Sequence, residues 1–212
     1  MIRTRLFRIV VCLFVLFLLQ ASCLRNRPMP VDAGACPAAA FRWLTTPNRQ
    51  ERHLSRYDFL IRKYAKRIDM DWRLLASIIY HESKFNERAL SPVGAKGLMQ
   101  VMDIAAEHYG MPDADLFDPE TNIRLGTLVF DDLESQFRQE GVNPDDLFRF
   151  ALAAYNVGGG ALARRRAQAD SLGLDPNAWS DVAAVFDLQE HTTPAYIDAV
   201  EATYIRYCSR FQ

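Results

Sequence analysis

The sequence has few of the residues that bind metals. Its 212 residues include four histidines and four cysteines, and the histidines do not stand at the spacings typical of zinc ligands. His81-Glu82 begins like the zinc-protease motif H-E-x-x-H, but Phe85 occupies the position of the second histidine. We therefore expect no metal site.

A dinucleotide-binding segment is also missing. The segment "GGGALA" at 158–163 fits a loose G-x-G-x-x-A pattern. The residues before it, "FRFALAAYNV", have a helical period where a dinucleotide-binding fold needs a strand. The three glycines are better interpreted as the end of a helix. Together with the missing metal ligands, this predicts a protein without a cofactor.

No hydrophobic run is long enough to cross a membrane. The longest run, Ile9–Leu19, has eleven residues, whereas a spanning helix needs roughly 20. It follows three arginines and precedes small residues, which is typical of a bacterial export signal. We expect residues 1–22 to be this signal peptide.

The end of the signal resembles a lipoprotein cleavage box. The segment "QASC" ends in Cys23, although Gln20 stands where the box usually has an aliphatic residue. A lipid on Cys23 would anchor the protein to a membrane without spanning it, and secretion with an unmodified Cys23 is the alternative. Leu24, in place of aspartate, resembles the pattern for outer-membrane retention. We therefore expect a periplasmic protein of the cell envelope, which is an outer-membrane lipoprotein if the host is Gram-negative.

The rest of the chain divides into a tether and one domain. Residues 23–46 are rich in proline, alanine and arginine without clear periodicity, so they are expected to form the tether of the lipid anchor. Residues 47–212 suffice for a single buried domain, which we expect to be a monomer. Cys36 and Cys208 are a possible disulfide pair in an oxidising compartment. Two unpaired cysteines are the alternative, because sequence does not test the geometry that a bridge requires.

Basic residues are not in excess. Removing residues 1–22 takes away three of 25 basic side chains and none of 26 acidic ones, which leaves a formal charge of −4. Nucleic-acid binding needs a basic surface, so no nucleic-acid partner is expected. We interpret "RRR" at 164–166 as a solvent-exposed helix face.

Alternating patterns long enough to require a sheet are absent, and helical spacing recurs instead. Four helices are predicted to start at capping residues, three of them followed by proline: Asp71, Asp118-Pro119, Asn143-Pro144 and Asp175-Pro176. A last helix is predicted from Thr193-Pro194 to Phe211. The chain is therefore expected to be mainly α, with room for one short β-hairpin around residues 90–102.

One carboxylate falls where the apolar pattern predicts the core. Glu82 follows Leu75, Ile78 and Ile79 by seven, four and three residues, so all four share one side of a helix. Both burial and the negative end of the helix dipole raise the pKa of a carboxyl group there. An acid that stays protonated near neutral pH can protonate the leaving oxygen of a glycosidic bond. The alternative is an exposed glutamate at a fraying helix end.

Three segments occur in order along residues 52–208: "ESKFNERALSPVGAKGLMQVM", "ALAAYNVGGGAL" and "TPAYIDAV". They resemble the signature segments of lytic transglycosylases of the soluble family-1 type. The resemblance implies a single goose-type lysozyme-like helical domain within the lysozyme-like α+β superfamily. It also implies a peptidoglycan substrate, whose β-1,4 bond between N-acetylmuramic acid and N-acetylglucosamine is cleaved to leave a 1,6-anhydro end.

The same resemblance assigns roles to residues. Glu82 would act first as acid and then as base, without a second carboxylate. The implied substrate-binding residues are Ser83, Gly97, Met99, Gln100, Tyr155, Asn156 and Tyr196. Tyr196 is expected to hydrogen-bond to the catalytic acid. Related sequences tend to carry glutamate four residues before this tyrosine, where this chain has Thr192.

Ordinary structural roles fit several of these residues equally well. The hydroxyl of Ser83 can bond to the backbone of its own helix, Met99 can be a packing residue, and the helical spacing of Tyr155 also fits the core. Glu87 and Asp103, the first two carboxylates after Glu82 in the sequence, can be surface charges. Two other functions remain open: a hydrolytic muramidase on the same fold, and a non-catalytic peptidoglycan-binding scaffold of the cell envelope.

Overall fold

The computed structural model describes residues 53–186 and 192–211. The predicted export signal, the tether and the lipidation site Cys23 lie outside the described residues, as does the predicted start of the domain at residue 47. These features therefore stay predictions.

Cys208, near the end of the chain, is disulfide-bonded. Its predicted partner, Cys36, lies outside the described residues. The oxidised state of Cys208 agrees with a protein of an oxidising compartment, whereas the pairing with Cys36 stays a prediction.

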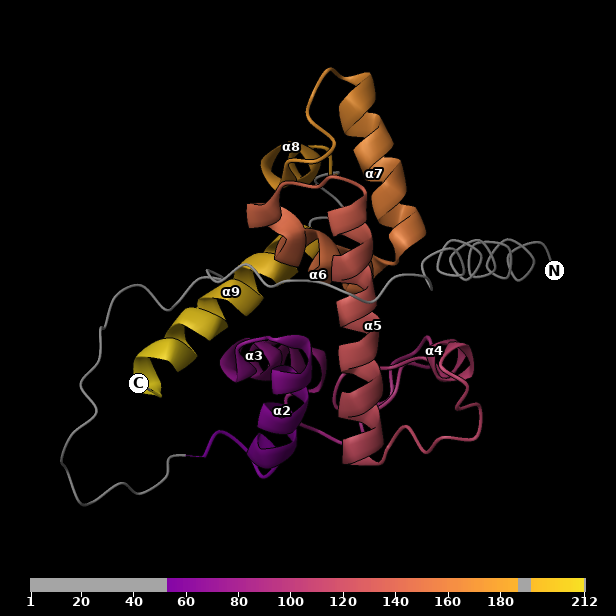
Figure 1. Cartoon of the computed structure of the whole chain (residues 1–212), viewed down its shortest axis with the longest axis vertical. Helices are drawn as coiled ribbons and strands as arrows, with labels where there is room; N and C mark the ends of the chain where they lie inside the picture. Colours follow the sequence, from indigo (N-terminus) through magenta and orange to yellow (C-terminus); the bar gives the residue numbers. More distant parts are fainter. Residues whose placement is uncertain (1–52, 187–191, 212) are drawn as a thin grey trace.

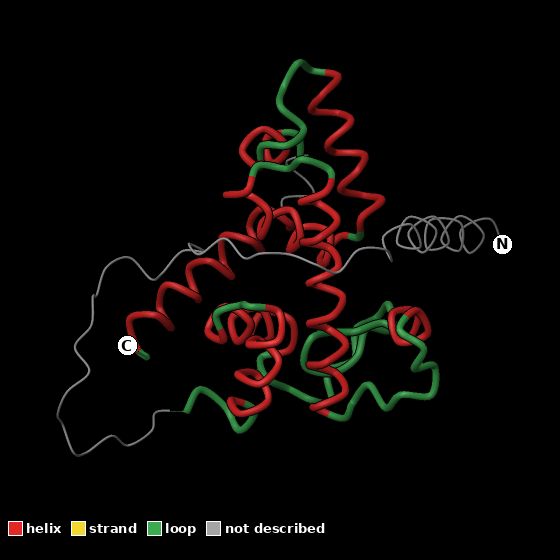
Figure 2. Tube along the Cα trace, viewed as in Figure 1, coloured by secondary structure: helices red, strands yellow, loops and turns green. Residues whose placement is uncertain are grey.

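The described residues are mainly helical, which confirms the predicted fold class (Figures 1 and 2). The α-helices are α2 (Asp58–Ala65), α3 (Trp72–Ser83), α4 (Asp103–His108), α5 (Pro119–Gln139), α6 (Leu147–Val157), α7 (Gly159–Ser171), α8 (Trp179–Ala184) and α9 (Thr192–Arg210). The 3-10 helices are η1 (Lys66–Ile68) and η2 (Pro144–Asp146). Within this part of the chain, no helix combines the length and the apolar character needed to cross a membrane.

The predicted hairpin around residues 90–102 is reduced to isolated antiparallel bridges. Lys96 pairs with Leu90 and with Val101, and the two backbone hydrogen bonds between Lys96 and Val101 are both 2.9 Å long. Proline and glycine interrupt the segment between these residues, and both weaken strands. No sheet forms within the described residues.

Most of the predicted helix starts are confirmed. The carboxylate of Asp71 accepts from the Arg73 N–H at 2.9 Å, and that of Asp118 accepts from the Thr121 N–H at 2.8 Å. The start predicted at Asp175-Pro176 is wrong, since α8 begins only at Trp179. The Asp175 carboxylate instead accepts from the Asn177 N–H at 2.8 Å, which closes a turn before the helix.

The interpretation of the three glycines as a helix end holds for one of them. Gly158 follows α6 and has a φ of +85°, a conformation that favours glycine. Gly159 and Gly160 already belong to the next helix, α7. The glycine run therefore joins two helices.

Helix α5 runs through the middle of the molecule and contacts α2, α4 and α6 (Figure 1). Its buried side includes Phe130, Leu133 and Phe137. The guanidinium of Arg166 lies 5.6 Å from the ring centroids of both Phe137 and Phe150. The prediction that all three arginines of "RRR" face solvent is therefore wrong for Arg166, because its aliphatic stem and charge pack on core aromatic rings.

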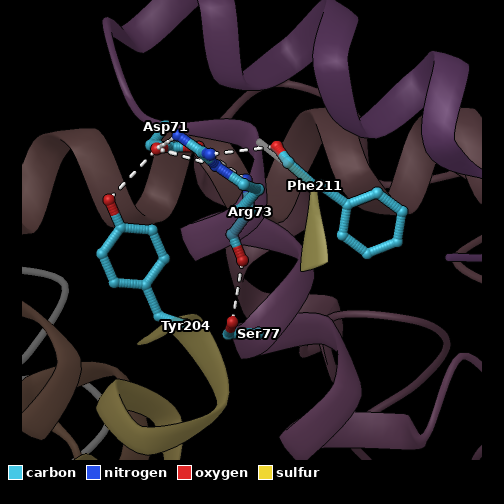
Figure 3. A network of polar contacts seen from close by, with 5 residues as sticks. All are labelled: Asp71, Arg73, Ser77, Tyr204 and Phe211. Carbon is cyan, nitrogen blue, oxygen red and sulfur yellow. Dashed lines mark hydrogen bonds and ion pairs between the residues drawn. The ribbon is translucent and has the colours of Figure 1, made fainter. Parts of the chain in front are cut away.

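Helices α3 and α9 form the most extensive helix contact among the described residues. A polar network fixes one end of this α3–α9 interface (Figure 3). Asp71 accepts hydrogen bonds from Arg73 at 2.6 Å and from the Tyr204 hydroxyl at 3.1 Å, and Arg73 also donates to the Phe211 carbonyl at 3.3 Å. Burial alone would raise the pKa of Asp71, but the hydrogen bonds from Arg73 and Tyr204 outweigh it and lower the pKa.

The loop that carries the bridges is fastened to α5 by one side chain. Asn122 is fully buried. Its Oδ1 accepts from the Met99 N–H at 2.7 Å, and its Nδ2 donates to the carbonyls of Lys96 and Leu116, both at 2.8 Å. This one amide therefore satisfies three backbone groups of the loop region.

Two glycines permit the loop to lie this close to α5. Gly97 has a φ of +72°, and a Cβ there would lie 2.4 Å from Nδ2 of Asn122. A Cβ on Gly126 would lie 2.6 Å from Sδ of Met99. Since real Cβ atoms do not approach other atoms this closely, larger residues at either position would push the loop away from the helix.

Replacing Asn122 by alanine should destabilise the protein by about 3 kcal/mol, because three hydrogen bonds to the backbone are lost and each is worth about 1 kcal/mol. Urea denaturation followed by circular dichroism measures the change. Asn86→Ala is the matched control, since the exposed side chain of Asn86 accepts a hydrogen bond from the N–H of Arg88 at 3.0 Å. Equal losses in the two variants would contradict the role assigned to Asn122.

Candidate active site

Glu82 lies in the last turn of α3 and is half-buried. The hydroxyl of Tyr196, at the start of α9, donates a hydrogen bond to Oε1 of Glu82. Burial raises the pKa of Glu82, while the bond from Tyr196 and the charge of Lys84 oppose this rise without cancelling it. The carboxyl group therefore holds its proton to a higher pH than an exposed glutamate, as its place on the apolar stripe predicts.

The chain turns sharply just after the acid. Lys84 and Phe85 have φ values of 54° and 61°, a left-handed conformation that is rare for residues other than glycine. The Lys84 N–H bonds to the Tyr80 carbonyl at 2.9 Å and closes α3. The Lys84 ammonium lies 4.0 Å from the centroid of the Tyr80 ring. This turn ends the helix immediately after Glu82 and Ser83.

Two tyrosines accompany Glu82. Burial is the largest cause that raises the pKa of Tyr196 far above its usual value, and the nearby charge of Glu82 is the second. The phenol therefore keeps its proton and remains a hydrogen-bond donor. Burial and the charge of Glu82 also raise the pKa of Tyr155. The Tyr155 hydroxyl donates to the Met99 carbonyl at 2.7 Å. Helices α3, α6 and α9 thus meet the loop at one place.

The loop residues predicted to bind substrate have distinct positions. Met99 is fully buried and packs against α5. Gln100 is half-buried with a φ of 52°, and its side-chain nitrogen donates to the carbonyls of Gly97 at 3.0 Å and Ala89 at 3.4 Å. Position 97 requires glycine, because the backbone there lies too close to Asn122 to leave room for a side chain. Backbone carbonyls of the loop itself thus fix the orientation of the Gln100 side-chain amide.

Ser83 and Asn156 have structural bonds in addition to any role in binding. The Ser83 hydroxyl is buried and donates to the Ile79 carbonyl at 3.2 Å, which is the backbone alternative expected for a helical serine. Asn156 is exposed, and its Oδ1 accepts from the Thr193 hydroxyl at 2.9 Å. This bond joins the end of α6 to the start of α9 beside Tyr196.

The first two carboxylates after Glu82 in the sequence have other partners. Glu87 accepts from the Tyr57 hydroxyl at 2.6 Å and forms an ion pair with Arg56 at 3.1 Å. Asp103 pairs with Lys96 at 2.7 Å. Among the described residues, the groups that shift the pKa of Glu82 are Tyr196 and Lys84, and neither is a carboxylate.

Metal binding finds no support in the part of the chain that the structure describes. Residues 53–186 and 192–211 contain no group of three histidine, cysteine, aspartate or glutamate side chains that could hold a metal ion.

The sequence did not indicate the roles of Asn122, which lies outside the predicted motifs, and of Thr193, which begins the segment "TPAYIDAV" but was given no role in the site. Asn122 offered one signal: it lies four residues before Gly126 on the buried side of a long helix. A polar residue and a glycine at this spacing indicate a close backbone approach. Thr193 offered no signal beyond its place at the start of "TPAYIDAV" and in the first turn of the last helix.

Known proteins that resemble this chain include one protein family and several individual relatives. The family model described as the transglycosylase SLT domain matches residues 59–177. A membrane-bound lytic murein transglycosylase F from Desulfosudis oleivorans is 37% identical over 163 residues, covering 74% of this chain and 35% of that protein. The protein of the same name from Marinobacter nauticus is 40% identical over 132 residues, covering 62% of this chain and 26% of that protein. The chain thus spans about a third or less of these curated relatives.

Solved structures show the same fold. An inactive mutant of the lytic transglycosylase Slt from Pseudomonas aeruginosa matches with a TM-score of 0.55 and 26% identity, over 73% of this chain and 24% of that one. The 70 kDa soluble lytic transglycosylase from Escherichia coli matches with a TM-score of 0.53 and 29% identity, over 71% of this chain and 24% of that one. The fold is therefore that of the lysozyme-like lytic transglycosylases, as the resemblance implied. Since the family model covers more than half of its residues, the chain belongs to the transglycosylase SLT family.

Proposed function

We propose that the protein is a lytic transglycosylase that cleaves the β-1,4 bond between N-acetylmuramic acid and N-acetylglucosamine in peptidoglycan and leaves 1,6-anhydromuramoyl ends. The observation that carries this proposal is the half-buried Glu82, whose pKa is raised by burial and whose carboxyl group is held by Tyr196. Family membership and the printed names of the relatives support the choice of substrate.

The reaction uses Glu82 twice. The protonated carboxyl group gives its proton to the glycosidic oxygen as the bond to C1 of the muramic sugar breaks. The resulting carboxylate then removes the proton from the C6 hydroxyl of the same sugar, and O6 bonds to C1. Glu82 ends the cycle protonated, and no water is consumed.

The surroundings of Glu82 suit both steps. Burial favours the protonated form that the first step needs, and the hydrogen bond from Tyr196 stabilises the carboxylate that the second step needs. A retaining hydrolase would place a second carboxylate about 5 to 5.5 Å from the first. Glu87 and Asp103, the first two carboxylates after Glu82, are instead held by Arg56, Tyr57 and Lys96, and no carboxylate is among the described groups that shift the pKa of Glu82. This favours transglycosylation over the hydrolytic muramidase that the sequence left open.

We also propose that the protein works in the periplasm as a monomer, held at the membrane by a lipid on Cys23. The relatives are named membrane-bound lytic murein transglycosylases, which supports a place in the cell envelope. Mass spectrometry of the mature N-terminus tests the anchor, since acylated Cys23 and unmodified Cys23 differ by the mass of the lipid.

Glu82→Gln should lower the release of anhydromuropeptides from purified peptidoglycan at least about a hundredfold, because the amide provides no transferable proton and general acid–base catalysis contributes at least this much. Mass spectrometry of the soluble products measures the loss and tests the reaction, since anhydro products are lighter by one water than hydrolysis products. Glu107→Gln, a matched change at an exposed position of α4, should leave the rate unchanged. Unchanged release by Glu82→Gln would indicate a different acid, and no release by the wild type would favour a binding protein.

Tyr196→Phe should lower the rate about 10- to 100-fold and move the alkaline limit of activity to higher pH. The variant loses the hydrogen bond that stabilises the Glu82 carboxylate, so the pKa of Glu82 should rise further. The pH dependence of kcat/KM measures the shift. The matched control is Tyr64→Phe, which removes a hydroxyl bonded to Glu120 at 2.9 Å and should leave the alkaline limit of activity in place. An alkaline limit that moves to lower pH in Tyr196→Phe would contradict the role assigned to Tyr196.

Glu82→Gln should also make the protein more stable at neutral pH. A glutamate whose pKa is raised on folding contributes full stability below its ordinary value of 4.5 and loses it as pH rises through the folded value. The uncharged glutamine avoids this loss. Urea midpoints of wild type and variant should therefore coincide in acid and separate as pH rises, with the variant higher. A variant that is less stable than wild type at neutral pH would refute the burial argument.

A further inference from the structure

His81 is a half-buried titratable residue next to Glu82 that the proposed mechanism does not use. Its ring extends across the α3–α9 interface, where Nε2 lies 2.9 Å from Oγ1 of Thr203. The backbone of Ala199 also acts on the ring, since it raises the pKa of His81. Thr203 is buried, and it lies one helical turn after Ala199. The imidazole thus connects the end of α3 to one turn of α9.

The same ring contacts the tyrosine that holds the acid. The ring centroids of His81 and Tyr196 are 6.2 Å apart with an interplanar angle of 89°, and Tyr80 packs edge-on against His81 at 5.2 Å. Edge-to-face contacts of this kind are favourable and directional. Since the Tyr196 hydroxyl bonds to Glu82, the angle of its ring sets the direction of that bond.

The surroundings of His81 favour an uncharged ring. Burial lowers the pKa of His81, and the charges of Lys84 and Arg206 lower it further, against the opposing effect of the Ala199 backbone. Arg206 donates to the same Thr203 oxygen at 2.9 Å. The groups that face the ring are Tyr80 from α3 and Lys84 directly after that helix, with Thr203, Arg206 and Tyr196 from α9. No carboxylate is among these described neighbours. A protonated ring would add a third positive charge.

We propose that His81 is a positioning residue: its uncharged ring, bonded to Thr203, holds Tyr196 at the angle that presents the hydroxyl to Glu82. Protonation of the ring weakens this contact and lowers activity at acid pH. The inference rests on the proposed function for its effect on rate. In that mechanism the free enzyme needs protonated Glu82, so Glu82 accounts for an alkaline limit of activity and leaves an acid limit to another group. His81 supplies the acid limit, at a pH below its ordinary pKa of 6.5.

Three variants separate this role from simple packing. His81→Gln keeps a donor and an acceptor for Thr203 but binds no proton. It should retain at least about a third of the neutral rate and lose the acid limit. His81→Ala should lower kcat about tenfold with little change in KM, because positioning acts on the chemical step. Tyr204→Phe is the matched control: it removes a hydroxyl from the same interface that bonds to Asp71, and it should keep both the rate and the acid limit.

A spectroscopic titration tests the coupling without substrate. In wild-type protein with 13C-labelled tyrosine and 15N-labelled histidine, the Tyr196 ring signals should move with the same midpoint as the His81 signals. In His81→Gln this transition of Tyr196 should disappear. An acid limit that persists in His81→Gln, or Tyr196 signals that ignore the titration of His81, would overturn the proposal. If the wild type releases no anhydro products, the proposed function fails, while the titration still decides whether His81 positions Tyr196.

Discussion

The hydrogen bond between Tyr196 and Glu82 is the interaction on which the rest of the site depends. The two residues are 114 positions apart in sequence, so the bond exists only because α9 lies against α3. The contact of His81 with Thr203 fastens the same interface beside the acid, whereas that of Asp71 with Tyr204 fastens it at the other end of α3. Polar bonds beside the acid are expected where catalytic groups must be held, because a displacement of about 1 Å can cost a hundredfold in rate.

Burial of Glu82 sets function against stability. The apolar side of α3 contributes Leu75, Ile78 and Ile79, all without exposed surface, to the core. A carboxyl group on that side is stable when protonated and costly when ionised. The hydrogen bond from Tyr196 stabilises the ionised form of Glu82 and so offsets part of this cost. It therefore reduces the free-energy difference between the protonated and ionised forms, both of which the reaction needs in turn. A glutamine would suit the fold better and would abolish the chemistry, as is common for catalytic positions.

The features that could be predicted from the sequence are those decided within a few residues. The caps at Asp71 and Asp118 and the side of α3 that carries Glu82 follow from spacing alone. The solvent exposure of Arg166 was predicted wrongly because the aromatic rings that it contacts, those of Phe137 and Phe150, come from other helices. The roles of Asn122 and His81 were missed for the same reason, since these residues bond to residues 23 and 122 positions away, and the spacing of Asn122 from Gly126 indicates a close approach without naming the partner.

Two structural features from different parts of the chain hold the site, namely the loop and the α3–α9 interface. Tyr155 lies where the two features meet. Its hydroxyl bonds to the Met99 carbonyl of the loop, and the charge of Glu82 raises its pKa. Helix α6, which carries Tyr155, packs against both α5 and α9. Surface ion pairs such as Lys63 with Glu120 contribute little in water. The positions of the groups in the site are therefore fixed by buried and half-buried side chains that bond to distant backbone and side chains. A shift of α6 would change the surroundings of the acid and the position of the loop together.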